Sequence, residues 1–350
     1  MKMTMFKRYL RYHLKESLRP IICILVAVFA VTFLIGFNET STLTYELVDF
    51  ELQEVHYYRS TLTTPVTLLS ILVSVIPVIE FSFFKKRINL DCVYALPISR
   101  RTMGLVHYVT GAITLLGAFT LSYLLNFIFI LKRGVENFEN LPSLIVHYLL
   151  CVVIGAAVYT VLVFVFNEAN TMSDGIWFMI LWSLAMTLVV ATVAELHERI
   201  LDENPLGNAA YTATPFGLLV TSLTGGYENF VETNPNSATT FWSQADGIIF
   251  MIVWTVLGIA AALGLYFTFG KRKVEKTEEI SDSFFGYRVM IPLYAVTGMI
   301  SLSASEIVAI WVIIEIIAIL GYTIYRRGFH YKKSDIIVLL SLIIFLFVRF

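Results

Sequence analysis

The sequence is poor in charge and in cysteine. Only 15% of its 350 residues are Asp, Glu, Lys or Arg, whereas a soluble domain carries about 25%. The three cysteines (Cys23, Cys92 and Cys151) lie far apart and form no C-x-x-C pair, so neither a disulfide framework nor a cysteine-based zinc site is indicated. The net charge of −1 gives the chain no overall attraction to nucleic acid.

Motifs for phosphate binding and catalysis are also missing. The closest approach to a G-x-x-x-x-G-K-[ST] loop, Gly264 to Lys271, has five residues between its glycines and is followed by Arg272. No G-x-S-x-G elbow is present, although sequence order alone does not exclude a Ser–His–Asp hydrolase. No two histidines form an H-E-x-x-H or i, i+4 pair among His13, His56, His107, His147, His197 and His330. We therefore expect no catalytic, cofactor-binding or metal-ligating residue in this chain.

Long apolar runs, in contrast, are abundant, with 57% hydrophobic residues and a mean hydropathy of +0.76. A helix crosses a bilayer with about 20 apolar residues, so the runs predict an all-α, polytopic membrane protein. The first run follows a basic segment but precedes no small-residue cleavage site, which indicates a retained helix rather than a signal peptide. We predict crossings at residues 20–37, 63–84, 104–131, 142–166, 175–194 and 247–270, and three shorter ones at 288–303, 306–325 and 335–349.

The basic residues predict the orientation. Lys and Arg gather at the N-terminus, in the loops after the second and sixth spans, and before the last span. If the spans are right, these four segments lie on one side, which the positive-inside rule makes the cytoplasm. The loop at 167–174 has no basic residue and does not bear on the assignment. We expect a plasma-membrane protein with a cytoplasmic N-terminus.

Residues 1–19 are predicted to form an interfacial amphipathic helix. Apolar side chains recur every four residues along one stripe: Phe6, Leu10, Leu14 and Leu18. Basic residues occupy the other faces and would meet anionic lipid. Pro20 is expected to end this helix and turn the chain into the first span. The alternative is a merely basic cytosolic flank.

The segment 88–103, INLDCVYALPISRRTM, lies in the predicted cytoplasmic loop between the second and third spans. Pro97 forbids an uninterrupted helix, yet the stretch around it is apolar. An apolar surface in the cytosol suggests a docking element for another protein. A lid on the protein's own helices, or a turn lying on lipid headgroups, is the alternative from the residues alone.

The order of these features resembles the transmembrane subunit of ABC-2 type transporters, especially bacterial permeases of peptide-export and peptide-immunity operons. The resemblance covers about residues 1–280, with a six-span core at 20–270. Its most specific part is the stretch LDCVYALPISRRTM, and the Pro-Phe pair of YTATPFGLLV, before the sixth span, also fits. A cytoplasmic linker at 271–287 and a membrane extension at 288–350 depart from the six-helix plan.

The resemblance implies that the loop at 85–103 is a coupling helix seated in a groove of a separate ATP-binding subunit. The docking residues would be Asp91, Tyr94, Leu96, Pro97, Ile98, Ser99, Arg100 and Arg101. Tyr94, Leu96 and Ile98 would be apolar anchors. Pro97 would fix the turn, Ser99 would cap the short helix, and the arginines would pair with carboxylates or lipid phosphate. ATP and Mg²⁺ would be bound by the partner, and a second permease chain would complete the transporter.

Two carboxylates fall inside apolar runs. Glu315 is the more isolated, and an ionised carboxylate at mid-bilayer costs about 2.5–3.5 kcal/mol. It is therefore expected to pair, to face a polar cavity as a proton or substrate site, or to be protonated. Glu80, near the predicted cytoplasmic end of the second span, is expected to reach the interface or to pair with Lys85 or Lys86.

The predicted outer loops are acidic at residues 38–62 and 195–246. Acidic outer loops would attract cationic solutes, including cationic peptides. The positive-inside distribution of basic residues explains the acidity of these loops equally. Residues 207–226 are too polar for a free span and either lie in the outer interface or re-enter the membrane.

Two hypotheses follow. The first is a non-catalytic permease subunit of an ATP-driven exporter of a hydrophobic or amphipathic substrate. The second is an ATP-independent membrane protein, either an ion-coupled carrier or a lipid-modifying enzyme.

Overall fold

The computed structural model describes residues 2–38, 42–48, 51–57, 63–86, 97–132, 141–201, 214–219, 245–270, 277–279, 281, 283–301, 308–326 and 328–348. The chain divides into two compact units. The first comprises residues 1–80, 96–161 and 215–271, and the second comprises residues 81–95, 162–214 and 272–350.

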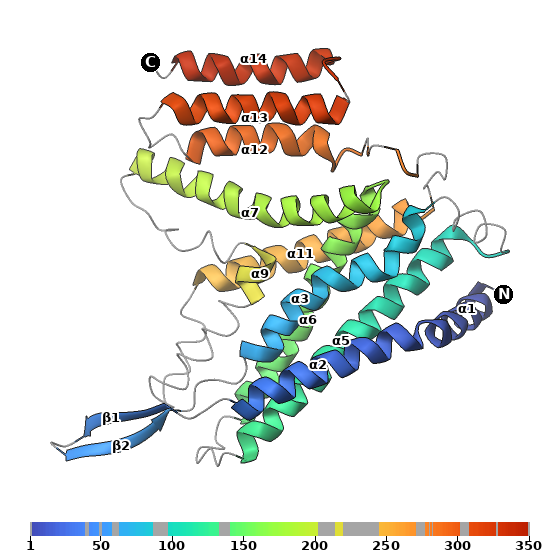
Figure 1. The fold of residues 1–350 in the computed structure, drawn as a ribbon, viewed down its shortest axis with the longest axis vertical. Helices are drawn as coiled ribbons and strands as arrows, with labels where there is room; N and C mark the ends of the chain where they lie inside the picture. Colours follow the sequence, from blue (N-terminus) through green and yellow to red (C-terminus); the bar gives the residue numbers. More distant parts are fainter. Residues whose placement is uncertain are drawn as a thin grey trace. The chain divides into compact units, whose positions relative to one another are not determined.

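Most of the described chain is helical (Figure 1). In order, the longer helices are α1 (Lys2–Glu16), α2 (Leu18–Asn38), α3 (Thr63–Phe81), α5 (Arg100–Lys132), α6 (Leu141–Glu168), α7 (Met172–Leu201), α11 (Ala245–Thr268), α12 (Tyr287–Ser301), α13 (Val308–Arg326) and α14 (Lys333–Val348). Within the described residues, six helices are long and apolar enough to cross a bilayer: α2, α3, α5, α6, α7 and α11. Apolar helices are thus present at all six predicted long crossings, which indicates a multi-pass membrane protein.

The expectation of an all-α fold is confirmed for the described helices, and one hairpin departs from it locally. Strands β1 (Thr42–Val48) and β2 (Glu51–Tyr57) form an antiparallel hairpin, with Thr42 opposite Tyr57 and Val48 opposite Glu51. The hairpin occupies the loop between the first two predicted spans. Local pairing satisfies backbone N–H and C=O groups in a segment too polar to enter a membrane.

The break between α1 and α2 lies at Ser17, not at Pro20. The N–H of Ser17 still bonds the carbonyl of His13 at 2.8 Å, and α2 begins at Leu18. Pro20 therefore sits in the first turn of α2, where proline is tolerated because its missing N–H has no helical acceptor there. Leu18, expected on the stripe of the first helix, belongs to α2 and is exposed.

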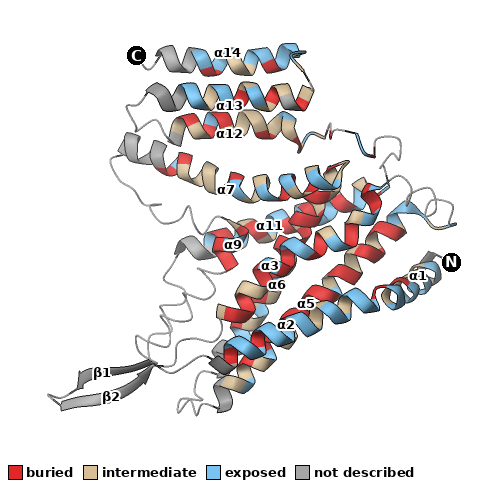
Figure 2. Ribbon diagram, viewed as in Figure 1, coloured by how far each residue is buried: buried red, intermediate tan, exposed pale blue. Residues whose placement is uncertain are grey.

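Close helix contacts in the first unit occur where side chains are small. Gly258 of α11 lies against Ala157 of α6, so that a Cβ at Gly258 would stand 2.8 Å from the Cα of Ala157. Between α2 and α5, the hydroxyls of Thr32 and Ser122 bond at 2.8 Å. Small residues and hydroxyls of this kind allow membrane helices to approach closely. Figure 2 shows the buried faces along α3, α5 and α6, whereas α2 is largely exposed.

The short helix α9 (Pro215–Gly217) is also part of the first unit. Pro215, Gly217, Leu218 and Leu219 are buried, while Phe216 is exposed. That residues 207–226 lie in the outer interface or re-enter the membrane stays a prediction, and of this range only residues 214–219 are among the described residues.

In the second unit, α12 contacts α7, α13 contacts α12, and α14 contacts both α12 and α13. Ala295, Met299, Ala318 and Leu342 form the core of the last three helices. α12, α13 and α14 have 15, 19 and 16 residues, so the three predicted shorter spans are present as helices.

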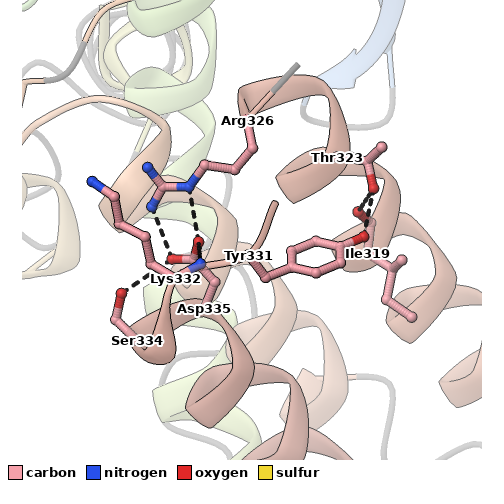
Figure 3. A network of polar contacts seen from close by, with 7 residues as sticks. All are labelled: Ile319, Thr323, Arg326, Tyr331, Lys332, Ser334 and Asp335. Atoms are coloured by element: carbon pink, nitrogen blue, oxygen red, sulfur yellow. Dashed lines mark hydrogen bonds and ion pairs between the residues drawn. The ribbon is translucent and has the colours of Figure 1, made fainter. Parts of the chain in front are cut away.

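The turn between α13 and α14 is fixed by an ion pair between the half-buried Arg326 and the buried Asp335 (Figure 3). The Arg326 guanidinium donates to both Asp335 carboxylate oxygens, at 2.8 and 3.1 Å. The backbone N–H of Lys332 donates to the same carboxylate at 3.0 Å, which satisfies a donor at the start of α14. Tyr331 completes the turn with a 2.7 Å hydroxyl contact to Thr323.

Candidate functional site: the docking segment and its anchors

Only part of the predicted docking surface can be placed. Asp91, Tyr94 and Leu96 lie outside the described residues, as does the rest of 87–96. Pro97, Ser99, Arg100 and Arg101 are exposed, and Ile98 is half-buried. The described end of the segment is therefore accessible from outside the chain.

Ser99 caps a helix, as expected. Its Oγ accepts the backbone N–H of Thr102 at 3.2 Å and lies 2.7 Å from the Thr102 hydroxyl, while its carbonyl accepts the N–H of Met103 at 3.1 Å. This is the geometry of an N-cap. The capped helix is α5 itself, because the residues after Ser99 continue without a break to Lys132. A separate short helix after Pro97 is thus a wrong expectation.

Arg101, on the first turn of α5, is directed onto α11. Its guanidinium carbon lies 5.2 Å from the centre of the Tyr266 ring, a cation–π distance. Gly270 leaves room for this side chain, since a Cβ there would stand 2.6 Å from the Arg101 Nε. The C-terminal end of the segment at 85–103 is therefore held on α5 by the Ser99 cap and contacts α11 through Arg101.

Lys85 anchors the entry of the segment. It ends η1 (Ser82–Lys85), a 3₁₀ turn directly after α3, and is only 2% exposed. Its Nζ donates to the carbonyl of Phe166 at 2.7 Å and to the carbonyl of Ala169, and lies 4.8 Å from the Phe166 ring. The carbonyls at a helix C-terminus lack helical partners, and a lysine satisfies them while its charge complements the helix dipole.

The turn between α6 and α7 also holds the linker that precedes α12. Asp174 accepts the Ser281 hydroxyl at 2.9 Å and the Tyr287 hydroxyl at 2.9 Å. The Ser281 hydroxyl accepts the N–H of Asn170 at 2.7 Å, and Ser283 donates to Glu168 at 2.9 Å. The loop at 167–174, uninformative for orientation, is thus the point to which both Lys85 and the linker attach.

Sequence reasoning paired Glu80 with Lys85 or Lys86, but the structure gives it other partners. The Glu80 Oε2 lies 3.2 Å from the His13 Nε2 and 3.4 Å from the His107 Nδ1, and all three side chains are buried. The residues come from α3, α1 and α5. Their ligand atoms lie within 4.8 Å of one another, a set that could hold a metal ion. No motif of fixed residue spacing identifies this cluster, because its three residues are far apart in the sequence.

Glu315 lies in α13 and is half-buried. Both of its carboxylate oxygens are buried and have no hydrogen-bond partner among the described residues. Of the arrangements expected for Glu315, pairing with another side chain is therefore not seen within the described part of the chain.

The stripe of α1 is partly covered. Phe6, Leu10 and Leu14 are half-buried, and α1 contacts α5. His13 is the buried side chain at that contact, and its ring lies 3.9 Å from the His107 ring. The helix therefore packs on the protein with one face and leaves other side chains, such as Tyr12, exposed.

Comparison with known proteins found no matching family model, no matching curated protein and no matching solved structure.

Proposed function

We propose that this chain is the transmembrane permease subunit of an ATP-driven exporter of the ABC-2 type. It docks a separate ATP-binding subunit through the segment at 85–103 and moves a hydrophobic or amphipathic substrate out of the cell or the membrane. The six apolar helices support a transport role, and the exposed side chains of Pro97, Ser99, Arg100 and Arg101 support docking.

The observation that carries the proposal is the Lys85 anchor. A docking segment can transmit force only if it is attached firmly to the membrane helices. Lys85 attaches its entry to the end of α6 through two hydrogen bonds from a buried, charged donor. Such bonds contribute about 1.5–3 kcal/mol each, so a movement imposed on the segment reaches α6 before the anchor breaks.

The partner supplies the chemistry in this proposal. ATP and Mg²⁺ are bound by the ATP-binding subunit, and a second permease chain, identical or different, lines the translocation path. The acidic predicted outer loops favour a cationic substrate such as a peptide, as in peptide export or immunity.

The proposal is tested by gentle purification of the tagged chain from its native membrane, with mass spectrometry of the proteins that accompany it. The Leu96→Asp variant, which places a charge on a predicted apolar anchor, is purified beside the wild type. We expect an ABC-type ATPase to accompany the wild type and to be at least about tenfold depleted from the variant, since burying an unpaired charge costs several kcal/mol. Equal recovery with both chains would contradict docking through this segment.

The Glu315 carboxylate supports a second candidate, an ion-coupled carrier, because a buried carboxylate without a hydrogen-bond partner in the described chain is typical of a proton site. The two candidates predict opposite results for Glu315→Gln. A permease driven by a partner should keep transport within about twofold of the wild type, since Gln keeps the size of the side chain and the partner-driven mechanism does not use the Glu315 charge. A carrier that uses Glu315 should lose transport while keeping its fold. Substrate efflux from cells, measured with and without a proton-motive force, separates them.

A further inference from the structure

The buried cluster of His13, Glu80 and His107 plays no part in the proposed docking. Each residue comes from a different helix, and each residue as a whole is less than a tenth exposed. Two imidazole nitrogens face the same carboxylate oxygen, at 3.2 and 3.4 Å. We propose that these three residues bind a divalent transition metal ion, with zinc the ion that the donor set fits best.

The distances fit a metal site, although the 3.2 Å contact of His13 with Glu80 is also within hydrogen-bond range. An N–H···O bond usually spans about 2.7–3.2 Å, so the His107 separation is long for one. Around tetrahedral zinc, ligands at about 2.0–2.1 Å from the metal lie about 3.3 Å from one another. Both measured nitrogen–oxygen separations are close to that edge length.

The chemistry of the set points to the same ion. Two imidazoles and one carboxylate are a common three-residue ligand set for zinc, with a fourth position left for water or a further oxygen. The hydroxyl of Ser17, also buried, lies 3.4 Å from the same His13 Nε2 and could take part there. Hard cations such as Mg²⁺ and Ca²⁺ prefer all-oxygen sites and are disfavoured by the two nitrogens.

The burial of the Glu80 carboxylate indicates what the bound ion would do for the protein. A carboxylate held away from water needs a compensating charge, and neutral imidazoles supply only dipoles. A dication supplies that charge and at the same time joins α1 to α3 and α5. Because Glu80 lies five residues before Lys85, the site fixes α1 to the helix that leads into the docking segment.

The test uses the full chain in lipid nanodiscs, stripped with a chelator and then dialysed against zinc sulfate. Elemental analysis should find one zinc ion per chain, and added zinc should raise the unfolding temperature. Removal of a ligand in His13→Gln, Glu80→Gln or His107→Gln should weaken zinc binding by more than the roughly 10–100-fold that loss of a supporting hydrogen bond costs. His147→Gln removes another buried histidine of the same unit, on α6, and should keep the zinc.

A spectrum of the wild type keeps the proposal testable if the variants fail to fold. Co²⁺ in place of zinc should give the intense visible bands of tetrahedral coordination with nitrogen and oxygen ligands. A wild-type chain that retains no zinc and gives only the weak spectrum of aqueous Co²⁺ would overturn the proposal. So would zinc that is retained equally by all three folded ligand variants.

Discussion

Single charges that are buried or half-buried decide how the segments between the helices are held. Lys85 donates to helix-end carbonyls, Asp174 accepts hydroxyls of the linker, and Asp335 pairs with Arg326. In each case a charge removed from water is compensated by hydrogen bonds of defined geometry. The family resemblance implied a helix cap at Ser99, and the structure places that cap on α5. The sequence could not predict the Lys85 contact, since the acceptor carbonyl of Phe166 lies 81 residues away.

Replacing Lys85 with methionine tests the anchor directly. Lys85→Met keeps the length of the side chain but leaves two carbonyls at the end of α6 without this donor. We expect each lost bond to lower the free energy of unfolding by about 1.5–3 kcal/mol. Thermal unfolding in detergent measures the effect, and recovery of the ATPase partner shows whether docking weakens with it.

Lys86 is the matched control for that substitution. It is the adjacent lysine and is exposed. Lys86→Met should change stability by no more than about 0.5 kcal/mol, as surface substitutions usually do. An equal loss of stability in both variants would show that positive charge, not the Lys85 contacts, is what matters there.

The helices, which follow from a local sequence pattern, were predicted, whereas the hairpin, which depends on pairing between two strands, was not. The six long spans follow from run length and hydropathy, and the structure places helices at all six. The hairpin of β1 and β2 was missed although Leu43, Tyr45 and Leu47 alternate with polar residues in β1, which is the period-2 signal of a strand. The break at Ser17 was misplaced because Pro20 is a strong signal that a helix tolerates in its first turn.

The close contact between α11 and α6 in the first unit can be tested by comparing substitutions at two glycines, Gly258 and Gly117. At Gly258 an added Cβ would stand 2.8 Å from the backbone of Ala157, so Gly258→Ala must push α11 away from α6. We expect a loss of about 1–3 kcal/mol, typical of overpacking. Thermal unfolding in the same detergent would measure it.

Gly117 of α5 serves as the control, because an added Cβ there meets nothing within 4 Å. Gly117→Ala should be neutral or stabilising by up to about 1 kcal/mol, since alanine favours helix. If Gly258→Ala proved as well tolerated as Gly117→Ala, the close packing of α11 on α6 would be wrong.

At the scale of the whole molecule, the sequence predicts a multi-pass membrane protein, and the six apolar helices agree. Partner, substrate and direction of transport depend on surfaces that no local pattern reports. Of the candidate site, the sequence predicted a docking segment at 85–103 and a helix cap at Ser99, and of these two the structure confirms the cap. The sequence could not locate the Lys85 anchor, the linker contacts of Asp174 or the histidine–glutamate cluster, because each joins residues that only the fold brings together.

Docking is tested most directly by photo-crosslinking in living cells. A photo-reactive amino acid is placed at Pro97, on the exposed end of the docking segment, and for comparison at Ile180, an exposed apolar position on α7 that lipid would cover. We predict that the probe at position 97 captures an ABC-type ATPase and that the probe at position 180 does not. Absence of any ATPase adduct at position 97, with the chain inserted at normal levels, would contradict the proposed coupling to an ATP-driven partner.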